Sequence, residues 1–336
     1  MARTAQSLLS VENLCVDIPT PDGVMHPVRD VSFEVRRGET LCIVGESGSG
    51  KSMTALALLD LLPKGAFRRA TSLRFNGEEL KDDFGLRVAG LRGNRIAMIF
   101  QDPMTALDPV HTVGRQLTEV YRRHKGGTQA AAVDRALFLL ARVGITEPER
   151  RLTQFPHELS GGLRQRVMIA MALMCGPDLL IADEPTTALD VTVQAQLLTL
   201  LADLQSELGM GMILITHDLG VVARIANNVG VMYAGKLMEK SDRTSLFEDP
   251  LHPYTQALLR CLPAGRRGKG RKLGVIPGLV PTLIGDMPGC LFRNRCAFRT
   301  ERCAETDGGL GEGPHQYRCI LTAERSRSNF ALASAS

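Results

Sequence analysis

The sequence predicts an α/β fold whose sheet is mostly parallel and covered by helices on both faces. Strand-like and helical patterns alternate from residue 40 to about residue 240. Two strand-like runs, LLIAD at 179–183 and MILIT at 212–216, are almost wholly apolar, which is typical of parallel strands buried on both faces. A glycine-rich turn, GESGSGKS at 45–52, joins a third such run to a helix.

The first elements are strands. The runs at 8–20 and 26–45 are rich in alternating apolar and β-branched residues, which indicates extended structure. A helical pattern follows at 51–63 and ends at Pro63. RIAMIFQDP, at 95–103, predicts a short buried strand that runs into a loop.

Helices then alternate with the two buried strands. The pattern at 113–143 is helical and is broken by KGGT at 125–128. The segment at 161–177 predicts a helix closed by Gly176-Pro177, and the segment at 193–209 predicts an amphipathic helix. This alternation supports the α/β assignment.

The composition is that of a soluble globular protein: 336 residues, 44% apolar, 23% charged, with a net charge of +4. The small net charge argues against a dedicated nucleic-acid binder. No apolar run approaches the roughly 20 residues needed to span a bilayer, and the N-terminus lacks the apolar core of a secretory signal. We therefore expect a cytoplasmic protein, which other chains would carry to a membrane if it works there.

The turn at 45–52 fits GxxxxGKS between a strand and a helix, the context that a phosphate-binding P-loop requires. Its glycines let backbone N–H groups face phosphate oxygens, and the helix N-terminus adds the positive end of its dipole. Lys51 is expected to reach the β- and γ-phosphates, and Ser52 to bind Mg²⁺. The alternative is a glycine-rich turn that binds nothing, which the flanking strand and helix disfavour. The predicted nucleotide-binding residues here are Gly45, Glu46, Ser47, Gly48, Ser49, Gly50, Lys51 and Ser52.

Two carboxylates, Asp183 and Glu184, end the buried strand LLIAD. Asp183 is predicted to hold Mg²⁺, directly or through water. Glu184 is predicted to accept a proton from a water that attacks the γ-phosphate. A solvated strand end is the alternative, and it is weak beside a P-loop because carboxylates are costly to place next to apolar residues.

Two neutral side chains follow other strands. Gln101 lies in the loop after AMIF, where its amide could touch Mg²⁺ or water. His217 follows MILIT, at a strand end from which it could hydrogen-bond the γ-phosphate as a catalytic residue. A single histidine is, however, more often structural.

The segment LSGGLRQR at 159–166 opens a helix with Ser160, Gly161 and Gly162. Such a helix start is a second anion-binding site. Taken alone, an ordinary helix cap is the better interpretation. A chain that already has a P-loop needs no second cradle for the same nucleotide, so the cradle makes sense if it serves the nucleotide of a partner.

Taken together, these segments resemble the nucleotide-binding subunit of an ABC transporter, in that family's order and over nearly the whole chain. The matching segments are Walker A at 45–52, the Q-loop at Gln101, the signature at 159–166, Walker B at 179–184, the D-loop TALD at 187–190 and the switch histidine His217. The resemblance implies a P-loop ABC-type domain: a RecA-like core with a mixed sheet, an antiparallel β subdomain and a helical subdomain. It also implies that Asp190, in the D-loop, belongs to the nucleotide site.

Longer stretches are similar to the D-type ATPase of dipeptide and oligopeptide importers. They are AMIFQDPMTALDP at 97–109, the run at 167–198, HPYTQALLRCLP at 252–263 and IPGLVP at 276–281. This resemblance implies an ATPase that energises peptide uptake at the cytoplasmic face of the cell inner membrane, using ATP and Mg²⁺. It implies a head-to-tail pair with a second, related ATPase, two ATP molecules between them, two transmembrane permeases and an extracytoplasmic binding protein. The groove around Gln101 would receive a helix from a permease.

Other functions compete with this one. A soluble ABC ATPase acting on ribosomes or DNA would usually carry two cassettes or a long coiled-coil insertion, and the sequence has neither. A regulatory module that only binds nucleotide would not need Glu184. An importer of a non-peptide solute is a further alternative, since the ATPase does not touch the cargo.

The sequence departs from the family at Ile18, where members commonly place an aromatic residue that stacks on adenine. An aliphatic side chain packs on the base without ring stacking, so we expect looser selectivity for the base. Leu163 stands where the subgroup often has Met, which should be harmless.

Four cysteines, Cys290, Cys296, Cys303 and Cys319, follow the spacing C-x5-C-x6-C-x15-C. Four thiolates can hold Zn²⁺ or an iron–sulfur cluster. The absence of a CxxC pair favours the larger cluster over zinc, and four free thiols in a loose tail are a third interpretation. The resemblance to the importer subgroup implies a four-iron, four-sulfur cluster at these cysteines. A structural staple is favoured over a redox sensor for its role.

These patterns predict an ATPase domain at 1–245, a small C-terminal cysteine-containing domain at 246–322 and a disordered tail at 323–336. The basic, glycine-rich segment at 265–272 is expected to be a solvated linker. Contact with anionic lipid or with an acidic partner is the alternative.

Overall fold

The computed structural model describes residues 7–80, 84–186, 190–262 and 274–335. The described residues divide into two compact units. Unit 1 comprises residues up to 9, 35–39 and 75–215, and unit 2 comprises 10–34, 40–74 and 216 onward.

Parallel strands form the centre of unit 1. They are β7 (Ile96–Ile99), β8 (Leu179–Asp183) and β9 (Gly211–Thr216), and the two-residue strand β6 (Glu78–Glu79), also assigned to this unit, belongs to a different sheet. β8 pairs in parallel with both β7 and β9. Every residue of β8 and β9 is buried, which confirms the prediction of parallel strands covered on both faces.

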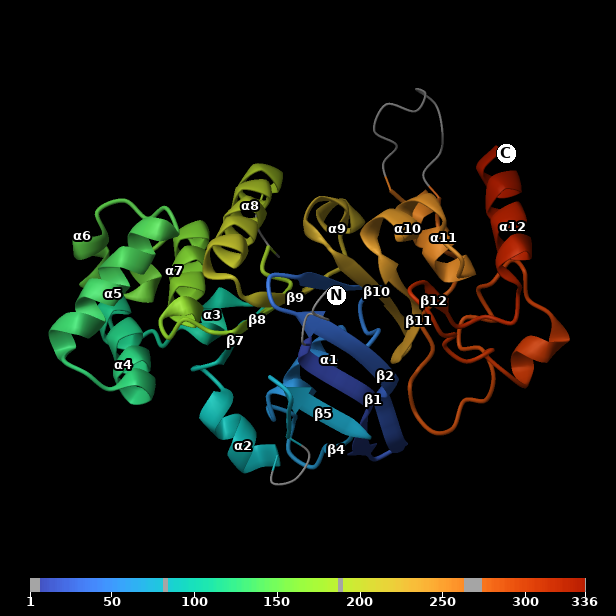
Figure 1. Ribbon diagram of the computed structural model, residues 1–336, viewed down its shortest axis with the longest axis horizontal. Helices are drawn as coiled ribbons and strands as arrows, with labels where there is room; N and C mark the ends of the chain where they lie inside the picture. Colours follow the sequence, from blue (N-terminus) through green and yellow to red (C-terminus); the bar gives the residue numbers. More distant parts are fainter. Residues whose placement is uncertain (1–6, 81–83, 187–189, 263–273, 336) are drawn as a thin grey trace, which may run out of the picture. The chain divides into compact units, whose positions relative to one another are not determined.

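The helices of unit 1 include those predicted at 113–143, 161–177 and 193–209, together with shorter helices that were not predicted. They are α2 (Phe84–Leu91), α3 (Pro103–Ala106), α4 (Val113–Lys125), α5 (Gln129–Arg142), α6 (Pro148–Leu152), the 3₁₀ helix η1 (Pro156–Glu158), α7 (Gly161–Leu173) and α8 (Val191–Leu208). α4, α5, α6 and α7 pack on one another as a helical cluster (Figure 1). The predicted break at 125–128 separates α4 from α5, and the side chain of Thr128 caps α5 by accepting a hydrogen bond from Ala131 N.

An ion-pair network fixes the start of β8. Asp178 accepts hydrogen bonds from Arg37 Nη1 at 2.8 Å and from Arg95 Nε at 2.7 Å. Burial alone would raise the pKa of Asp178, but the two arginines lower it below its ordinary value. The carboxylate therefore stays charged and holds the strand that carries Asp183.

Unit 2 has a mixed sheet. Its strands are β3 (Thr40–Val44), β10 (Asn228–Tyr233), β11 (Lys236–Asp242) and β12 (Gln316–Tyr317). β10 is parallel to β3 and antiparallel to β11, and β12 adds antiparallel to β11. The tight turn between β10 and β11 uses two left-handed residues, Ala234 at φ 49° and Gly235 at φ 84°.

Antiparallel strands and five helices complete unit 2 among the described residues. The strands that lie mostly in it are β1 (Ser7–Thr20), β2 (Gly23–Arg36), β4 (Phe67–Arg69) and β5 (Ser72–Phe75). β1 lies between β2 and β5 and also pairs with β4. The helices are α1 (Lys51–Leu58), α9 (Leu219–Ile225), α10 (Arg243–Glu248), α11 (Pro253–Arg260) and α12 (Ala323–Ala335), together with the 3₁₀ helix η2 (Glu301–Ala304).

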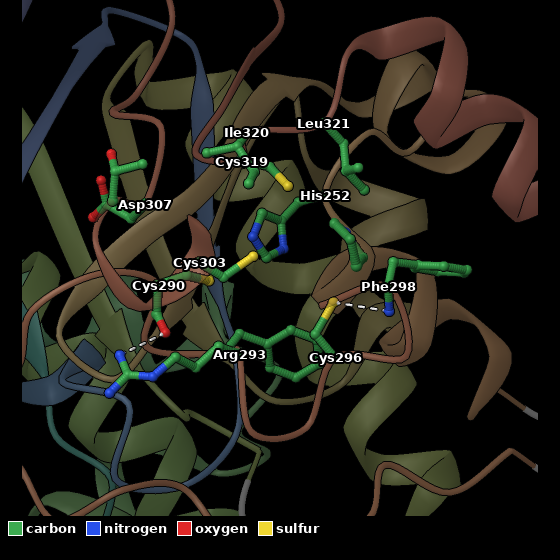
Figure 2. Close-up of a pocket in the computed structure, with 13 residues that line it drawn as sticks. His252, Cys290, Arg293, Cys296, Phe298, Cys303, Asp307, Cys319, Ile320 and Leu321 are labelled. Atoms are coloured by element: carbon green, nitrogen blue, oxygen red, sulfur yellow. Dashed lines mark hydrogen bonds between the residues drawn. The ribbon is translucent and has the colours of Figure 1, made fainter. Parts of the chain in front are cut away.

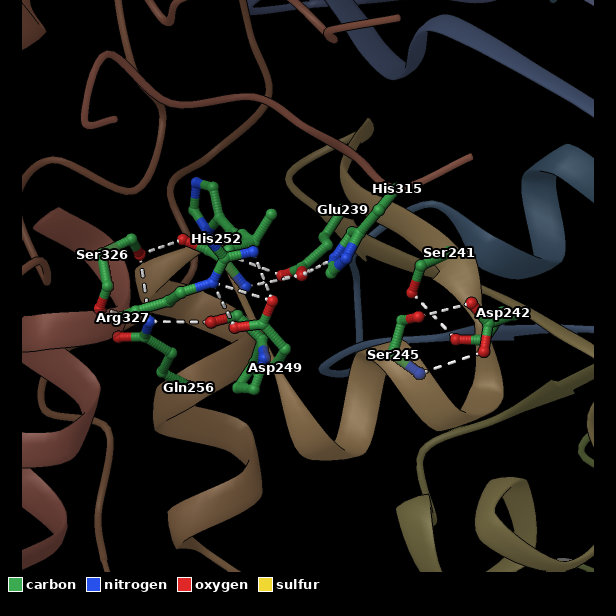
Figure 3. Close-up of polar contacts among 12 residues, drawn as sticks. Glu239, Ser241, Asp242, Ser245, Asp249, His252, Gln256, His315, Ser326 and Arg327 are labelled. Carbon is green, nitrogen blue, oxygen red and sulfur yellow. Dashed lines mark hydrogen bonds and ion pairs between the residues drawn. The ribbon is translucent and has the colours of Figure 1, made fainter. Parts of the chain in front are cut away.

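A buried carboxylate ties the C-terminal region to β11 (Figure 3). Glu239 is fully buried and accepts hydrogen bonds from Leu251 N at 2.7 Å and His252 N at 2.8 Å. His315 Nε2 lies 2.7 Å from the same carboxylate. The region from 246 onward thus belongs to the same unit as the P-loop, and the domain boundaries expected at 245 and 322 stay predictions.

The expected disorder at 323–336 is wrong for residues 323–335, which form α12. Helix-favouring alanines allow the helix, and tertiary contacts anchor it. Gln256 Nε2 donates to Ser326 Oγ at 3.0 Å, and Arg327 makes an ion pair with Asp249 at 2.6 Å (Figure 3). The basic segment at 265–272 lies outside the described residues.

Candidate active site

The P-loop turn requires glycine at two of its positions. Gly45 has a φ of 156° and Gly50 a φ of 102°. A Cβ atom would lie 2.0 Å from Met232 O at Gly45 and 2.1 Å from Pro27 O at Gly50. Gly50 is also the N-cap of α1. The turn therefore packs against β2 and β10 so closely that no side chain fits at either glycine.

The Lys51 side chain lies inside this turn. Only 5% of Lys51 is exposed, and its Nζ donates to Gly45 O and to Glu46 O, both at 2.9 Å. Ser52 follows in the first turn of α1. The ammonium group is thus held at the mouth of a helix N-terminus, where the backbone favours anions.

Glu46, the second residue of the turn, contacts the C-terminal region. Arg295 forms an ion pair with its carboxylate at 2.9 Å. Glu46 N donates to Tyr254 OH at 3.0 Å. Burial raises the pKa of Tyr254, so its hydroxyl stays neutral and can accept this bond.

In unit 1, the two predicted carboxylates follow one another at the end of β8. Asp183 is 5% exposed. Glu184 has a φ of 44°, in the left-handed region that is uncommon for residues other than glycine. Its backbone N donates to Ile215 O at 2.9 Å, and Gln101 Nε2 donates to Glu184 Oε2 at 3.2 Å. The predicted Q-loop residue and the predicted base are therefore direct neighbours.

The signature segment begins a helix as predicted. Ser160 is the N-cap of α7, with its Oγ accepting from Leu163 N at 3.4 Å. Within α7, Gln165 is 2% exposed and donates from Nε2 to Pro185 O at 2.6 Å. A buried glutamine thus joins the signature helix to the residue after Glu184.

His217 lies between β9 and α9, and its side chain is exposed. The neighbouring Asp218 caps α9 by accepting from Gly220 N at 2.7 Å, and its own N donates to Thr216 Oγ1 at 3.0 Å. These caps fix the backbone on the C-terminal side of His217.

Asp190 is the part of the predicted D-loop that the structure describes. It caps α8, and its Oδ1 accepts from Thr192 N at 3.0 Å and Val193 N at 2.9 Å. Residues 187–189 lie outside the described residues.

The predicted site residues are split between the two units. Unit 2 carries the P-loop and His217, and unit 1 carries Gln101, Ser160, Gly161, Gly162, Asp183, Glu184 and Asp190. Reasoning from the sequence missed Gln165, Tyr254 and Arg295. The GGLRQR pattern could have pointed to Gln165 as an uncharged polar residue between two arginines. Nothing in the sequence marks Tyr254 or Arg295 as neighbours of Glu46.

The four C-terminal cysteines line one cavity (Figure 2). Burial raises the pKa of Cys290 to about 11 and that of Cys296 to about 12, and it also raises the pKa of Cys319. Phe298 N donates to Cys296 Sγ at 3.4 Å. Buried thiols with such pKa values are protonated at neutral pH, so metal binding would release protons.

His252 lines the same cavity and is 1% exposed. Its Nδ1 accepts a hydrogen bond from Tyr254 N at 3.0 Å, and its Nε2 has no partner among the described residues. Because Nδ1 accepts, Nε2 of the neutral ring carries the proton, so the cysteine sulfurs are the metal-donor atoms of this cavity. Within the described ranges, however, no group of three or more His, Cys, Asp and Glu side chains is arranged to hold a metal ion. The sulfur donors are of the kind that bind a metal ion or cluster, but the described side chains are not arranged as a formed metal site.

Comparisons with known proteins agree with the motifs. Residues 28–187 match the family described as ABC transporter, and residues 238–303 match the family described as oligopeptide/dipeptide transporter, C-terminal region. A probable peptide ABC transporter ATP-binding protein of Sinorhizobium fredii is 51% identical over 92% of each chain. The dipeptide transport ATP-binding protein DppD of Escherichia coli is 47% identical over 90% of this chain and 93% of its own.

Solved structures share the fold. A dimeric ATP-binding cassette in a post-hydrolysis state, bound to ADP and Pi, matches with a TM-score of 0.62 and 25% identity over 70% of this chain and 98% of its own. The CbiO1 subunit of an ABC transporter complex from Clostridium perfringens matches with a TM-score of 0.60 and 28% identity over 73% of this chain and 92% of its own. None of the described helices has the length and apolar character needed to cross a membrane.

Proposed function

The chain belongs to the peptide-transporter branch of the ABC transporter ATP-binding proteins, and on this basis we propose which of its residues bind and hydrolyse ATP. The protein is the ATP-binding subunit of a dipeptide or oligopeptide ABC importer and an ATP-hydrolysing transport enzyme. The observation that carries the residue roles is the contact between Gln101 and Glu184, since it joins the Q-loop to a carboxylate placed to act as a base.

Hydrolysis begins with ATP in the P-loop. Lys51 exchanges the carbonyls of Gly45 and Glu46 for the β- and γ-phosphates, because an ammonium pairs more strongly with phosphate than with a neutral carbonyl. The loop N–H groups and the start of α1 stabilise the negative charge. His217 contacts the γ-phosphate from the loop after β9.

Glu184 is the general base. It removes a proton from a water molecule as the water oxygen attacks the γ-phosphorus and the bond to ADP breaks. The Gln101 amide orients the carboxylate by donating a hydrogen bond to it. Mg²⁺ bound with ATP supplies positive charge to the phosphates, and Ser52, Asp183 and Gln101, all oxygen donors, would hold it.

The signature residues serve a second nucleotide. Ser160, Gly161 and Gly162 start α7, a thirteen-residue helix whose N-terminus favours anions. We assign this cradle to the ATP bound by a partner ATPase, so that two ATP molecules close a head-to-tail pair. A heterodimer with a related ATPase subunit is our proposal for the pair, and we assign Asp190 to the same nucleotide site.

A peptide-importer ATPase works with transmembrane permeases and a binding protein. We place this chain at the cytoplasmic face of the inner membrane as a peripheral subunit held there by two permeases. The loop after Gln101 is the proposed contact with them, because a permease helix seated there would sense whether Glu184 is correctly placed.

The cysteine cavity is proposed to hold a four-iron, four-sulfur cluster, with Zn²⁺ as the alternative. Support comes from the chemistry of the donors: four cysteine sulfurs line one cavity. The cluster would act as a staple for a region that is poor in regular secondary structure between residues 274 and 322.

The direct test is peptide-stimulated phosphate release by the chain assembled with its permeases and binding protein. Lys51→Ala should abolish MgATP binding and phosphate release together. Equal phosphate release by this variant, or stimulation by ribosomes or DNA in place of peptide, would overturn the proposal.

A further inference from the structure

We propose that Arg295 is a positioning residue for the P-loop: it holds Glu46 in place and neutralises the Glu46 carboxylate next to the triphosphate. The guanidinium grips both carboxylate oxygens, with Nη1 at 2.9 Å from Oε1 and Nη2 at 2.9 Å from Oε2. This two-pronged pairing fixes orientation as well as charge. The inference rests on the assignment of residues 45–52 as the nucleotide-binding loop.

The surroundings of Arg295 give it one defined position. Its side chain is 5% exposed, and Nε donates to Pro277 O at 2.8 Å. Nη2 also donates to Ile276 O at 3.2 Å, and the guanidinium lies 5.6 Å from the centre of the Tyr233 ring. An arginine held this way loses little side-chain conformational entropy when it pairs with Glu46. A flexible surface arginine would lose much more on forming the same ion pair.

Glu46 is held at three separate groups. Arg295 holds the carboxylate, Tyr254 OH accepts from the backbone N, and Lys51 Nζ donates to the backbone O. In the proposed mechanism Lys51 leaves that carbonyl for the phosphates. Arg295 and Tyr254 are then what remains to keep the first turn of the loop in place.

The support is rigid because both residues are anchored in an aromatic cluster. The Tyr254 ring lies 4.7 Å from Tyr233 and 5.2 Å from Phe292, centre to centre. Phe292 and Arg295 belong to the loop that also carries Cys290 and Cys296, and Arg295 N donates to Phe292 O at 2.9 Å. The cysteine-containing region thus supports the nucleotide site of its own chain.

Arg295 also acts through its charge. Glu46 is one residue from the glycine that opens the phosphate cradle, so an unpaired carboxylate there would repel ATP. Removal of Arg295 leaves that charge in place, and changing Glu46 to glutamine removes it. The two substitutions should therefore be coupled.

The experiment measures equilibrium binding of MgATP to the full-length chain, with its thermal midpoint recorded for every variant. Arg295→Met should raise the Kd about tenfold, the size expected for one uncompensated charge near the triphosphate. Glu46→Gln in the Arg295→Met background should bring the Kd back to within about threefold of the wild-type value. In the assembled transporter, Arg295→Met should raise KM for ATP and leave kcat nearly unchanged, and Arg295→Lys should not restore it because a single ammonium cannot form the paired contact.

Arg299→Ala is the matched control, since Arg299 is exposed on the same loop and carries the same charge. It should leave the Kd unchanged. Unchanged ATP affinity in Arg295→Met would overturn the proposal, and so would a weakened affinity that Glu46→Gln fails to restore, since a general loss of structure would do the same. A separate measurement tests the assignment of residues 45–52 as the nucleotide-binding loop. If the Lys51→Ala variant still binds ATP, that assignment is wrong.

Discussion

The Nε2 amide of Gln101 donates to Glu184 Oε2 across 3.2 Å. This bond orients the carboxylate. Gln101→Leu should therefore lower kcat for phosphate release by the assembled transporter roughly tenfold, the effect of losing one hydrogen bond to a charged group. MgATP affinity should fall less than kcat. A kcat equal to that of the wild type would show that Gln101 does not orient the base.

Asp17 should make stability depend on pH at the acid end. Burial raises its pKa, but hydrogen bonds with His26 at 2.6 Å and Arg69 at 2.5 Å lower it below 3.8 overall. A lowered folded-state pKa means that the stabilisation is present above the unfolded-state value and is lost as the pH falls below it. Asp17→Asn should cost about 1 kcal/mol in the free energy of unfolding at pH 7. In denaturant titrations the difference from the wild type should shrink as the pH drops below 3.8, and a constant difference would contradict this account.

Ile18 lies on β1 and is partly exposed. Ile18→Tyr should add ring stacking on adenine and lower the Kd for ATP about three- to tenfold. Binding of inorganic triphosphate, which has no base, is the control and should not change. Equal tightening for both ligands would show that residue 18 does not face the base.

The cysteine cavity predicts metal content. Protein purified without oxygen should carry about four irons per chain, and Cys303→Ala should lose most of them. Cys261→Ala is the control, because Cys261 is not among the residues that line the cavity. One zinc per chain and no iron would show that the site binds Zn²⁺ in place of a cluster. Wild-type protein without metal would contradict the proposed metal site.

Much of the fold was predictable because its pattern is local. The wholly buried β8 and β9, the break between α4 and α5, and the P-loop before α1 all follow from apolar runs and glycines that stand next to each other in the sequence. The family followed from motifs of the same local kind.

The remaining features depend on contacts between residues far apart in the chain. Arg295 reaches Glu46 across 249 positions, and Gln101 reaches Glu184 across 83. The segment 323–335 was predicted to be disordered because its residues are mostly small and polar. It forms α12 because Gln256 and Asp249 contact it, and the composition of the segment alone cannot reveal these contacts.

The most direct test of the account is the substitution Glu184→Gln in the assembled transporter, with MgATP binding and phosphate release measured on the same preparation. Glutamine keeps the shape of the side chain and removes its ability to take a proton. We predict ATP affinity close to the wild-type value and phosphate release slowed at least about 100-fold. Phosphate release near the wild-type rate would contradict the assignment of Glu184 as the base.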